Sequence, residues 1–319
     1  MKNNLPKVTI GMPVYNGALT LDATIKTILS QNFTDFELII SDDCSKDDTQ
    51  KICERYQQLD DRIKYFRQDK NFGMPVKNFQ FVLDQAQGEY FMFASHDDPY
   101  HPEFIQTMLE VMEFDEDCVI AFSDYSIANA SGDEKISITP SSSCSKSPVA
   151  RYLSRVIDFQ PALIYGLFRK RYFFSEDLKL FDFFEVSLGL RMAIKGKIRI
   201  VNKNLWAWNI DKTRKSHSIY PIGFYVRDLL RIKRKEQKST KHSDGLNRRV
   251  SETQMEDRLM NYLPFYFSQL KLIFKSFNIF KASLISLILT YYVSGKIIYL
   301  MIRPRGMDID FNDPDNIPK

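Results

Sequence analysis

Residues 6–17 read PKVTIGMPVYNG, a short apolar run that ends in Pro13, Tyr15 and Asn16. Apolar residues then recur at helical spacing through Leu21–Leu29, and a second apolar run, Phe36–Ile40, leads into Asp42 and Asp43. A strand followed by a helix and another strand is the pattern of βα units. The stretch therefore predicts an α/β fold with a mostly parallel sheet, beginning with a strand over Val8–Val14.

The same alternation continues outward along the chain. Further strands are expected at Ile63–Phe66, Tyr90–Ala94, Val119–Phe122, Leu163–Phe168 and Ile198–Val201, and helices near Val76–Ala86 and Glu185–Lys195. Residues 129–148, rich in Ser, Gly and Pro, predict a loop or a mobile linker.

Composition limits the class of protein. With 319 residues and 44% hydrophobic content, the chain can bury a substantial core. Its four cysteines lack paired or metal-ligand spacing, which indicates free thiols in a reducing compartment. The first residues contain no apolar stretch typical of a signal peptide. We therefore expect a cytoplasmic protein.

The net charge of +4 conceals an asymmetry. Residues 196–306 carry 22 Lys and Arg against 7 Asp and Glu, whereas the rest of the chain is acidic. Two regions with different partners are expected. The basic cluster Arg231–Lys241 lies in no recognised nucleic-acid motif, and the acidic half would repel phosphate, so we expect no nucleic-acid partner.

Polar residues cluster where the predicted strands end. Besides the two clusters above, Asp97 and Asp98 follow the strand at Tyr90–Ala94. Each aspartate pair alone could merely cap a turn or helix. Open α/β sheets bind ligands at this edge, and paired carboxylates suit Mg²⁺ or Mn²⁺ that also takes phosphate oxygens. Walker and dinucleotide glycine motifs are absent from the sequence, so a sugar nucleotide is the natural candidate.

Four segments carry a resemblance to a known family: PKVTIGMPVYNG, FELIISDDCSKDDT at 36–49, Asn71-Phe72-Gly73, and GEYFMFASHDDPYHPEF at 88–104. In order and spacing they resemble the motifs of family 2 glycosyltransferases, over roughly residues 7 to 210. The resemblance implies the GT-A fold, a sandwich with a mostly parallel central sheet and helices on both faces, and a role in bacterial cell-surface polysaccharide synthesis. C-terminal helices would be attached to it.

The resemblance also implies donor-binding residues. Pro13 and Tyr15 would line the base pocket next to Asn16, and Asp43 would accept a hydrogen bond from the base. Asp42 would support that loop. The remaining donor-side positions by this resemblance are Asn71, Gly73, Lys77 and Asn78. Lys77 alone could equally be a solvated helix charge.

The segment Ser95–Asp98, SHDD, stands where the family has its metal-binding DXD-type motif. By this resemblance Asp98 ligates the Mg²⁺ or Mn²⁺ that bridges the donor phosphates, and Asp97 binds ribose or a metal-bound water. His96 replaces an acidic residue of many relatives, with either a structural or a direct role.

An inverting transfer needs a general base at the acceptor hydroxyl. Residues 184–196, FEVSLGLRMAIKG, resemble the family's base-bearing helix, with Glu185 where relatives have Asp; Asp182 is the alternative base. The literal Glu176-Asp177 pair lies nineteen residues before Gly196, in the wrong register.

The resemblance also implies other acceptor-side positions. Gly166 and Arg169 resemble the family's acceptor-side Gly-x-x-Arg segment, although Arg169 could be a surface cation. A closing lid could include Arg214, Lys215 and His217, or these could form an exposed basic loop. For Trp206 and Trp208 we favour core positions over sugar stacking.

The expected domains follow. Residues 1–220 form the catalytic domain, with a nucleotide-binding half at 1–125 and an acceptor-side half at 150–220; 221–306 are basic and aromatic, and 307–319 form an acidic tail. The uncharged run 282–295 has 14 residues, short of the roughly 20 that span a bilayer. We expect an interfacial helix pair on the inner membrane surface; the alternative is packing on the catalytic domain.

The expected function is inverting transfer from a nucleotide-diphosphate sugar, with a UDP-sugar favoured, to a lipid-linked saccharide. The alternative is an inactive glycosyltransferase-like scaffold or a sugar-nucleotide binding protein, because His96 and Glu185 depart from the commonest pattern. A sugar nucleotidyltransferase would carry a Gly-rich, Arg-containing loop after the first strand, where this chain has MPVYNG.

Overall fold

The computed structural model describes residues 5–129, 135–158, 160–178 and 184–210, together with 273–276, 282 and 286. The chain divides into two units, Met1–His217 and Ser218–Lys319. The first unit carries the fold and the site. Of the expected C-terminal helices, only a helical turn at 273–276 and two single residues are described. No helix in the described part of the chain is long and apolar enough to cross a membrane.

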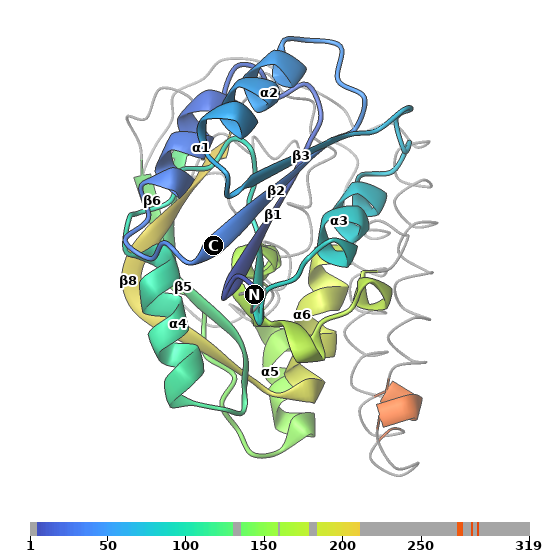
Figure 1. The fold of residues 1–319 in the computed structure, drawn as a ribbon. Helices are drawn as coiled ribbons and strands as arrows, with labels where there is room; N and C mark the ends of the chain where they lie inside the picture. Colours follow the sequence, from blue (N-terminus) through green and yellow to red (C-terminus); the bar gives the residue numbers. More distant parts are fainter. Residues whose placement is uncertain are drawn as a thin grey trace, which may run out of the picture. The chain divides into compact units, whose positions relative to one another are not determined.

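The first unit is built on one eight-stranded sheet (Figure 1). Its strands are β1 (Val8–Val14), β2 (Phe36–Asp42), β3 (Ile63–Arg67), β4 (Tyr90–Phe93), β5 (Cys118–Asn129), β6 (Lys135–Ile138), β7 (Leu167–Arg169) and β8 (Lys197–Ile210). The order across the sheet is β3-β2-β1-β4-β7-β5-β6, and β8 also pairs with β5.

Most of the sheet is parallel. β1 lies between β2 and β4, and its Gly11 is paired with Ile39 on one side and Phe93 on the other. β3 extends this parallel block, and β8 runs parallel to β5. β7 is antiparallel to both β4 and β5, and β6 is antiparallel to β5. The carboxyl ends of β1 to β4 therefore share one edge, as the sequence predicts.

Helices cover both faces of this sheet. They are α1 (Leu21–Leu29), α2 (Thr49–Leu59), α3 (Pro75–Asp84), α4 (Phe104–Phe114), α5 (Pro148–Ile157) and α6 (Phe184–Lys195). Figure 1 shows α1, α2 and α4 on one side of the strands and α3, α5 and α6 on the other. This is the sandwich that the resemblance implies.

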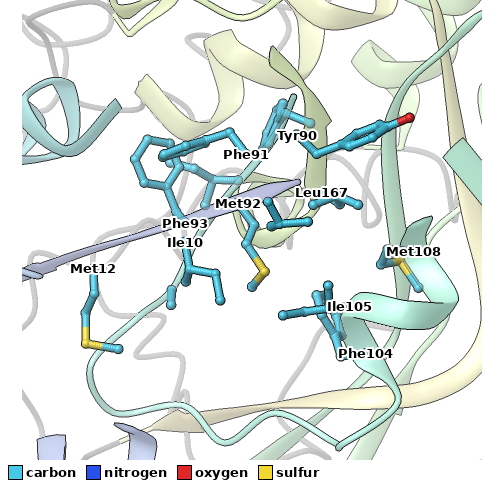
Figure 2. Close-up of a cluster of buried hydrophobic side chains, with 14 of the residues drawn as sticks. Ile10, Met12, Tyr90, Phe91, Met92, Phe93, Phe104, Ile105, Met108 and Leu167 are labelled. Carbon is cyan, nitrogen blue, oxygen red and sulfur yellow. The ribbon is translucent and has the colours of Figure 1, made fainter. Parts of the chain in front are cut away.

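The core fills both interfaces between the sheet and the helices. Side chains alternate along β4: Figure 2 shows Phe91 and Phe93 on one side of the strand and Met92 on the other, toward Phe104 and Ile105 of α4. All five side chains are at most 1% exposed. The strands are apolar on both faces because helices cover both faces.

Two sequence-based expectations are wrong. Residues 129–148 are not a simple loop, because β6 pairs with β5 inside them and α5 begins at Pro148. The expected strand Leu163–Phe168 is a 3₁₀ helix, Pro161–Tyr165, followed by the short β7. Gly166 joins the two where the chain passes close to β5, and a Cβ there would lie 2.8 Å from the Ala121 carbonyl oxygen.

Candidate functional site

The loops after β1 and β2 are joined by hydrogen bonds. The Asn16 N–H donates to Ser45 Oγ at 2.9 Å, and the Lys46 N–H donates to Asn16 Oδ1 at 2.9 Å. Asn16 has a positive φ of 51°, a conformation that asparagine tolerates better than most residues. This crosslink holds the strand end in place and leaves the neighbouring Tyr15 side chain 44% exposed.

Asp42 is a fully buried carboxylate that holds the loop after β2 together. Its Oδ1 accepts the Ser45 N–H at 2.8 Å, and its Oδ2 accepts Tyr65 Oη at 2.9 Å and Arg67 Nη1 at 2.6 Å. Arg67 also donates to the Ser45 carbonyl at 3.0 Å. Burial and the bond to Asp42 raise the pKa of Tyr65, so its hydroxyl stays a donor.

Asp43 connects the loop after β2 to the loop after β3. Its Oδ1 accepts the Phe72 N–H at 2.7 Å, and its carbonyl accepts Asn71 Nδ2 at 3.0 Å. Asn71 Oδ1 accepts the Gly73 N–H at 2.8 Å, in a turn for which Gly73 has a φ of +72°. Burial raises the pKa of Asp43, and the Phe72 N–H opposes that shift.

The first turn of α3 carries Lys77 and Asn78. Lys77 is exposed, whereas Asn78 is 4% exposed beneath the strand ends. Asn78 Nδ2 donates to the carbonyl of Ser41 at 2.9 Å and to that of Val14 at 3.5 Å. We therefore assign Asn78 to holding β1 and β2 together at their carboxyl ends.

The acidic segment after β4 lies beside these loops. Thr20 Oγ1 lies 3.2 Å from His96 Nδ1, so His96 connects this segment to the beginning of α1. The Ser95 hydroxyl donates to Asp97, and Asp98 is only 1% exposed. Among the described residues, no group of three or more His, Cys, Asp or Glu side chains could hold a metal ion.

This donor set fits a cation that draws further ligands from a substrate. Mg²⁺ and Mn²⁺ commonly take one or two carboxylates and complete their shell with water or phosphate oxygens. Asp97 and Asp98 could supply those carboxylates. The site therefore suits a metal that binds together with a diphosphate.

The predicted acceptor side includes α6. Glu185 is the second residue of α6, but its side chain lies outside the described part of the structure, as does the whole of Asp182. Both remain predicted bases. In contrast, Asp177 is 7% exposed; its Oδ2 accepts Lys195 Nζ at 2.5 Å and the Phe174 N–H at 3.1 Å, which are structural contacts.

The alternative role of Arg169 as a surface cation is wrong, because its side chain is 5% exposed. Its guanidinium donates to Tyr90 Oη and to the carbonyls of Cys118, Met112 and Asp115. Arg169 is paired with Tyr90, the first residue of β4, whereas the carboxylates follow the last. It therefore lies at the opposite end of the strand, and the acceptor-pocket role does not fit it.

The remaining predicted residues divide into core and undescribed positions. Trp206 is 2% exposed and stacks on the half-buried Trp208, with their ring centroids 6.2 Å apart. Trp206 is thus a core residue, as favoured from the sequence. The possible lid residues Arg214, Lys215 and His217 lie outside the described residues.

Comparison with known proteins identifies the family of this chain. The model of glycosyl transferase family 2 matches residues 9–194, more than half of the chain. The chain belongs to glycosyl transferase family 2. Within that family it is 38% identical over 106 residues to the GalNAc(5)-diNAcBac-PP-undecaprenol beta-1,3-glucosyltransferase of Campylobacter jejuni, a match that covers 33% of this chain and 34% of the relative.

A glycosyltransferase of Bacillus subtilis named for teichuronic acid biosynthesis is 33% identical over 132 residues, or 41% of this chain and 52% of that protein. The chain thus spans about a third to a half of the length of these two curated relatives. The structure of S. aureus TarS 1–349 in complex with UDP-GlcNAc has a TM-score of 0.54 at 19% identity, covering 70% of this chain and 65% of that chain. This likeness shows the fold.

Sequence reasoning missed two features of this family 2 domain. Tyr65 and Arg67 hold Asp42, and Asn209 at the end of β8 contacts the acidic segment after β4. Alternation on β3 could have indicated that Tyr65 and Arg67 share one face. For Asn209 the sequence offers no comparable signal, because its partners lie more than a hundred residues away.

Proposed function

We propose that this protein is an inverting glycosyltransferase that moves a sugar from a UDP-sugar to a hydroxyl of a lipid-linked saccharide. The observation that carries the proposal is that the loops after β1, β2, β3 and β4 meet at one sheet edge. Hydrogen bonds join the first to the second, the second to the third, and the first to the fourth. That edge combines the exposed ring of Tyr15 with four aspartates, which suits a base and a diphosphate bound through a divalent cation.

The relatives support the choice of donor and acceptor. The Campylobacter jejuni enzyme is named for a pyrophosphate-linked undecaprenol substrate, and TarS has been solved with UDP-GlcNAc. Both descriptions belong to those proteins. For this chain they favour a UDP-sugar as donor and a lipid-linked saccharide as acceptor.

On the donor side, Tyr15 and Pro13 would contact the base, and Asp43 would accept a hydrogen bond from it. The loop contacts described above hold all three before the donor arrives, which lowers the entropy lost on binding. Asp98, with Asp97 beside it, would hold a divalent cation. When bound, Mg²⁺ or Mn²⁺ would act as a Lewis acid that stabilises the charge of the departing diphosphate.

On the acceptor side, Glu185 would take the proton of the attacking hydroxyl. The hydroxyl oxygen forms a bond to the anomeric carbon as the bond from that carbon to the diphosphate oxygen breaks on the opposite face. The configuration is thereby inverted. The structure gives the backbone position of this predicted base, the second residue of α6.

We also propose that the basic, aromatic residues 221–306 bring the enzyme to the inner membrane surface, where a lipid-linked acceptor would be found. Each Lys or Arg near an anionic lipid surface contributes about 1 kcal/mol of binding free energy. Removal of the chain from Phe277 onward should then shift the protein from the membrane to the soluble fraction. An unchanged distribution would exclude this role for the removed segment.

The donor site can be tested by calorimetric titration with UDP, dTDP and GDP, each with and without Mn²⁺. We expect UDP to bind in a Mn²⁺-dependent manner, and Asp98→Asn to abolish that dependence. Asp61→Asn, a change at an exposed aspartate, is the matched control and should bind like the wild type. If no nucleotide binds, the proposed donor class is wrong and an inactive scaffold is favoured.

A further inference from the structure

The segment 97–101, which carries the two site carboxylates, runs antiparallel to the end of β8. Tyr100 lies opposite Trp206, and the His101 N–H donates to the Leu205 carbonyl at 2.9 Å. In such a ladder, residue numbers rise along one strand as they fall along the other. The position of each further hydrogen bond is therefore fixed by this first pair.

The ladder continues for one more bond and then changes. The Ala207 N–H donates to the Pro99 carbonyl at 3.3 Å, as the register requires. The next bond in the register would run from the Asn209 N–H to the Asp97 carbonyl. Instead, the Asn209 side chain fills that position: its Nδ2 donates to the Asp97 carbonyl at 2.7 Å.

Because the side-chain amide occupies the ladder position, the main-chain N–H of Asn209 can donate to another acceptor. That N–H donates to Asp98 Oδ1 at 2.9 Å. Asp98 is 1% exposed, and a buried carboxylate depends on hydrogen-bond donors from the protein. A main-chain N–H has no rotamers, so it also fixes the direction of the carboxylate that it binds.

We propose that Asn209 is a positioning residue for Asp98. Its side-chain amide replaces the main-chain N–H in the ladder, so that the main-chain N–H can orient the Asp98 carboxylate toward the donor diphosphate and its cation. The inference rests on the proposed function, in which Asp98 holds that cation. It predicts that the amide of residue 209 is required for metal-dependent donor binding because it acts through Asp98.

The chemistry of the side chain gives distinct expectations for three variants. Asn209→Ala removes the amide, so the main-chain N–H would return to its ladder acceptor, the Asp97 carbonyl, and Asp98 would lose this one main-chain donor. Asn209→Asp keeps the shape but places an acceptor against that carbonyl. Asn209→Gln keeps the amide on a side chain one methylene longer, and should partly restore the wild-type behaviour.

The test measures UDP binding to the full chain by calorimetry, with and without Mn²⁺. We expect Asn209→Ala and Asn209→Asp to weaken Mn²⁺-dependent UDP binding by about 10- to 100-fold, the usual effect of removing a group that orients a metal ligand. UDP binding without metal should be unchanged. Asn204→Ala, a change at an exposed asparagine of the same strand, is the matched control and should bind like the wild type.

A double-mutant cycle separates positioning from a general structural role. In the Asp98→Asn background, Asn209→Ala should cause no further loss of UDP affinity, because the residue acts through Asp98. Additive losses, or equal losses with and without Mn²⁺, would overturn the inference. So would wild-type affinity in Asn209→Ala. If the wild type itself shows no metal-dependent UDP binding, the proposed function fails first and this inference with it.

Discussion

The Phe72 N–H donates to the Asp43 carboxylate over 2.7 Å, which holds the loop after β3 against the loop after β2. Asp43 thus has a structural partner as well as its proposed role toward the base. The carboxylate is only 5% exposed, and burial raises its pKa. Nucleotide binding and stability should therefore both respond to the protonation of this one group.

Stability should depend on pH through Asp43. Because its folded pKa is raised, the folded protein retains a proton that the unfolded chain loses above about pH 4. The stability that Asp43 contributes is present below that pH and is lost as the pH rises through the folded pKa. Asn cannot ionise, so Asp43→Asn should gain stability relative to the wild type as the pH rises. Urea unfolding at several pH values would measure this difference; Asp61→Asn is the control, and a difference that falls with pH would contradict the prediction.

Asp42 should matter for stability more than any exposed aspartate. Asp42→Ala removes the partner of the partly buried Tyr65 hydroxyl, of a main-chain N–H and of the guanidinium of Arg67. Since the Arg67 side chain remains 32% exposed, we expect the lower end of the range for a broken buried pair, about 3 kcal/mol in the free energy of unfolding. Asp48→Ala breaks only an exposed pair with Lys51 and should cost less than about 1 kcal/mol. Similar losses in both variants would argue against this role.

Arg169 should stabilise the fold without taking part in catalysis. Arg169→Ala removes the guanidinium donors of the Cys118 and Met112 carbonyls, and each lost donor is worth about 1–3 kcal/mol. We expect a clear fall in melting temperature but an unchanged kcat for the folded enzyme. Arg171→Ala, at an exposed position two residues further along the chain, should change neither. A raised KM for the acceptor at an unchanged melting temperature would contradict this prediction and support a role of Arg169 in acceptor binding.

Two glycines should respond in opposite ways to alanine. Gly166→Ala would place a Cβ 2.8 Å from the Ala121 carbonyl oxygen and should cost about 1–3 kcal/mol. In the middle of α6, a Cβ at Gly189 would meet only Leu163 at 3.7 Å, an ordinary contact. Gly189→Ala should therefore be neutral or stabilise by up to about 1 kcal/mol. Chemical unfolding of the two variants measures both, and equal effects would contradict the packing described.

Glu185 should be the group whose loss stops transfer. Glu185→Gln removes the proposed base and should lower kcat by about 10²- to 10⁴-fold, with donor binding retained. Glu176→Gln is the matched control, since Glu176 is exposed on a short 3₁₀ helix. Initial rates with a lipid-linked acceptor provide the measurement. Full activity in Glu185→Gln would contradict this assignment and favour Asp182 as the base.

The parallel half of the fold could be predicted from the sequence because its signals are local. β1 matches its expected bounds, Val8–Val14, and β2 to β4 lie within two residues of theirs. Each strand is a short apolar run followed by polar residues, and parallel strands bring those polar ends to one edge. The strand-end residues of the site followed from the same pattern.

Residues 129–169 were harder to predict because their order depends on tertiary contacts. β6 has only four residues, and pairing with β5 rather than its own sequence makes it a strand. α5 did carry a local signal: Ser147 caps it by accepting the Ala150 N–H, and Pro148 stands at its first position. The apolar run Leu163–Phe168 suited a strand or a buried helical turn equally.

Because β8 both closes the sheet against β5 and borders the acidic segment after β4, the two halves of the enzyme share one strand. A chimera made to exchange acceptor specificity could take everything after residue 125 from a relative. Such a swap would replace that strand as well. A chimera that keeps residues 197–210 with the nucleotide half, and exchanges only what lies between, should preserve donor binding. The unit that should be kept together in a chimera is thus discontinuous in sequence, although its parts are in contact in the structure.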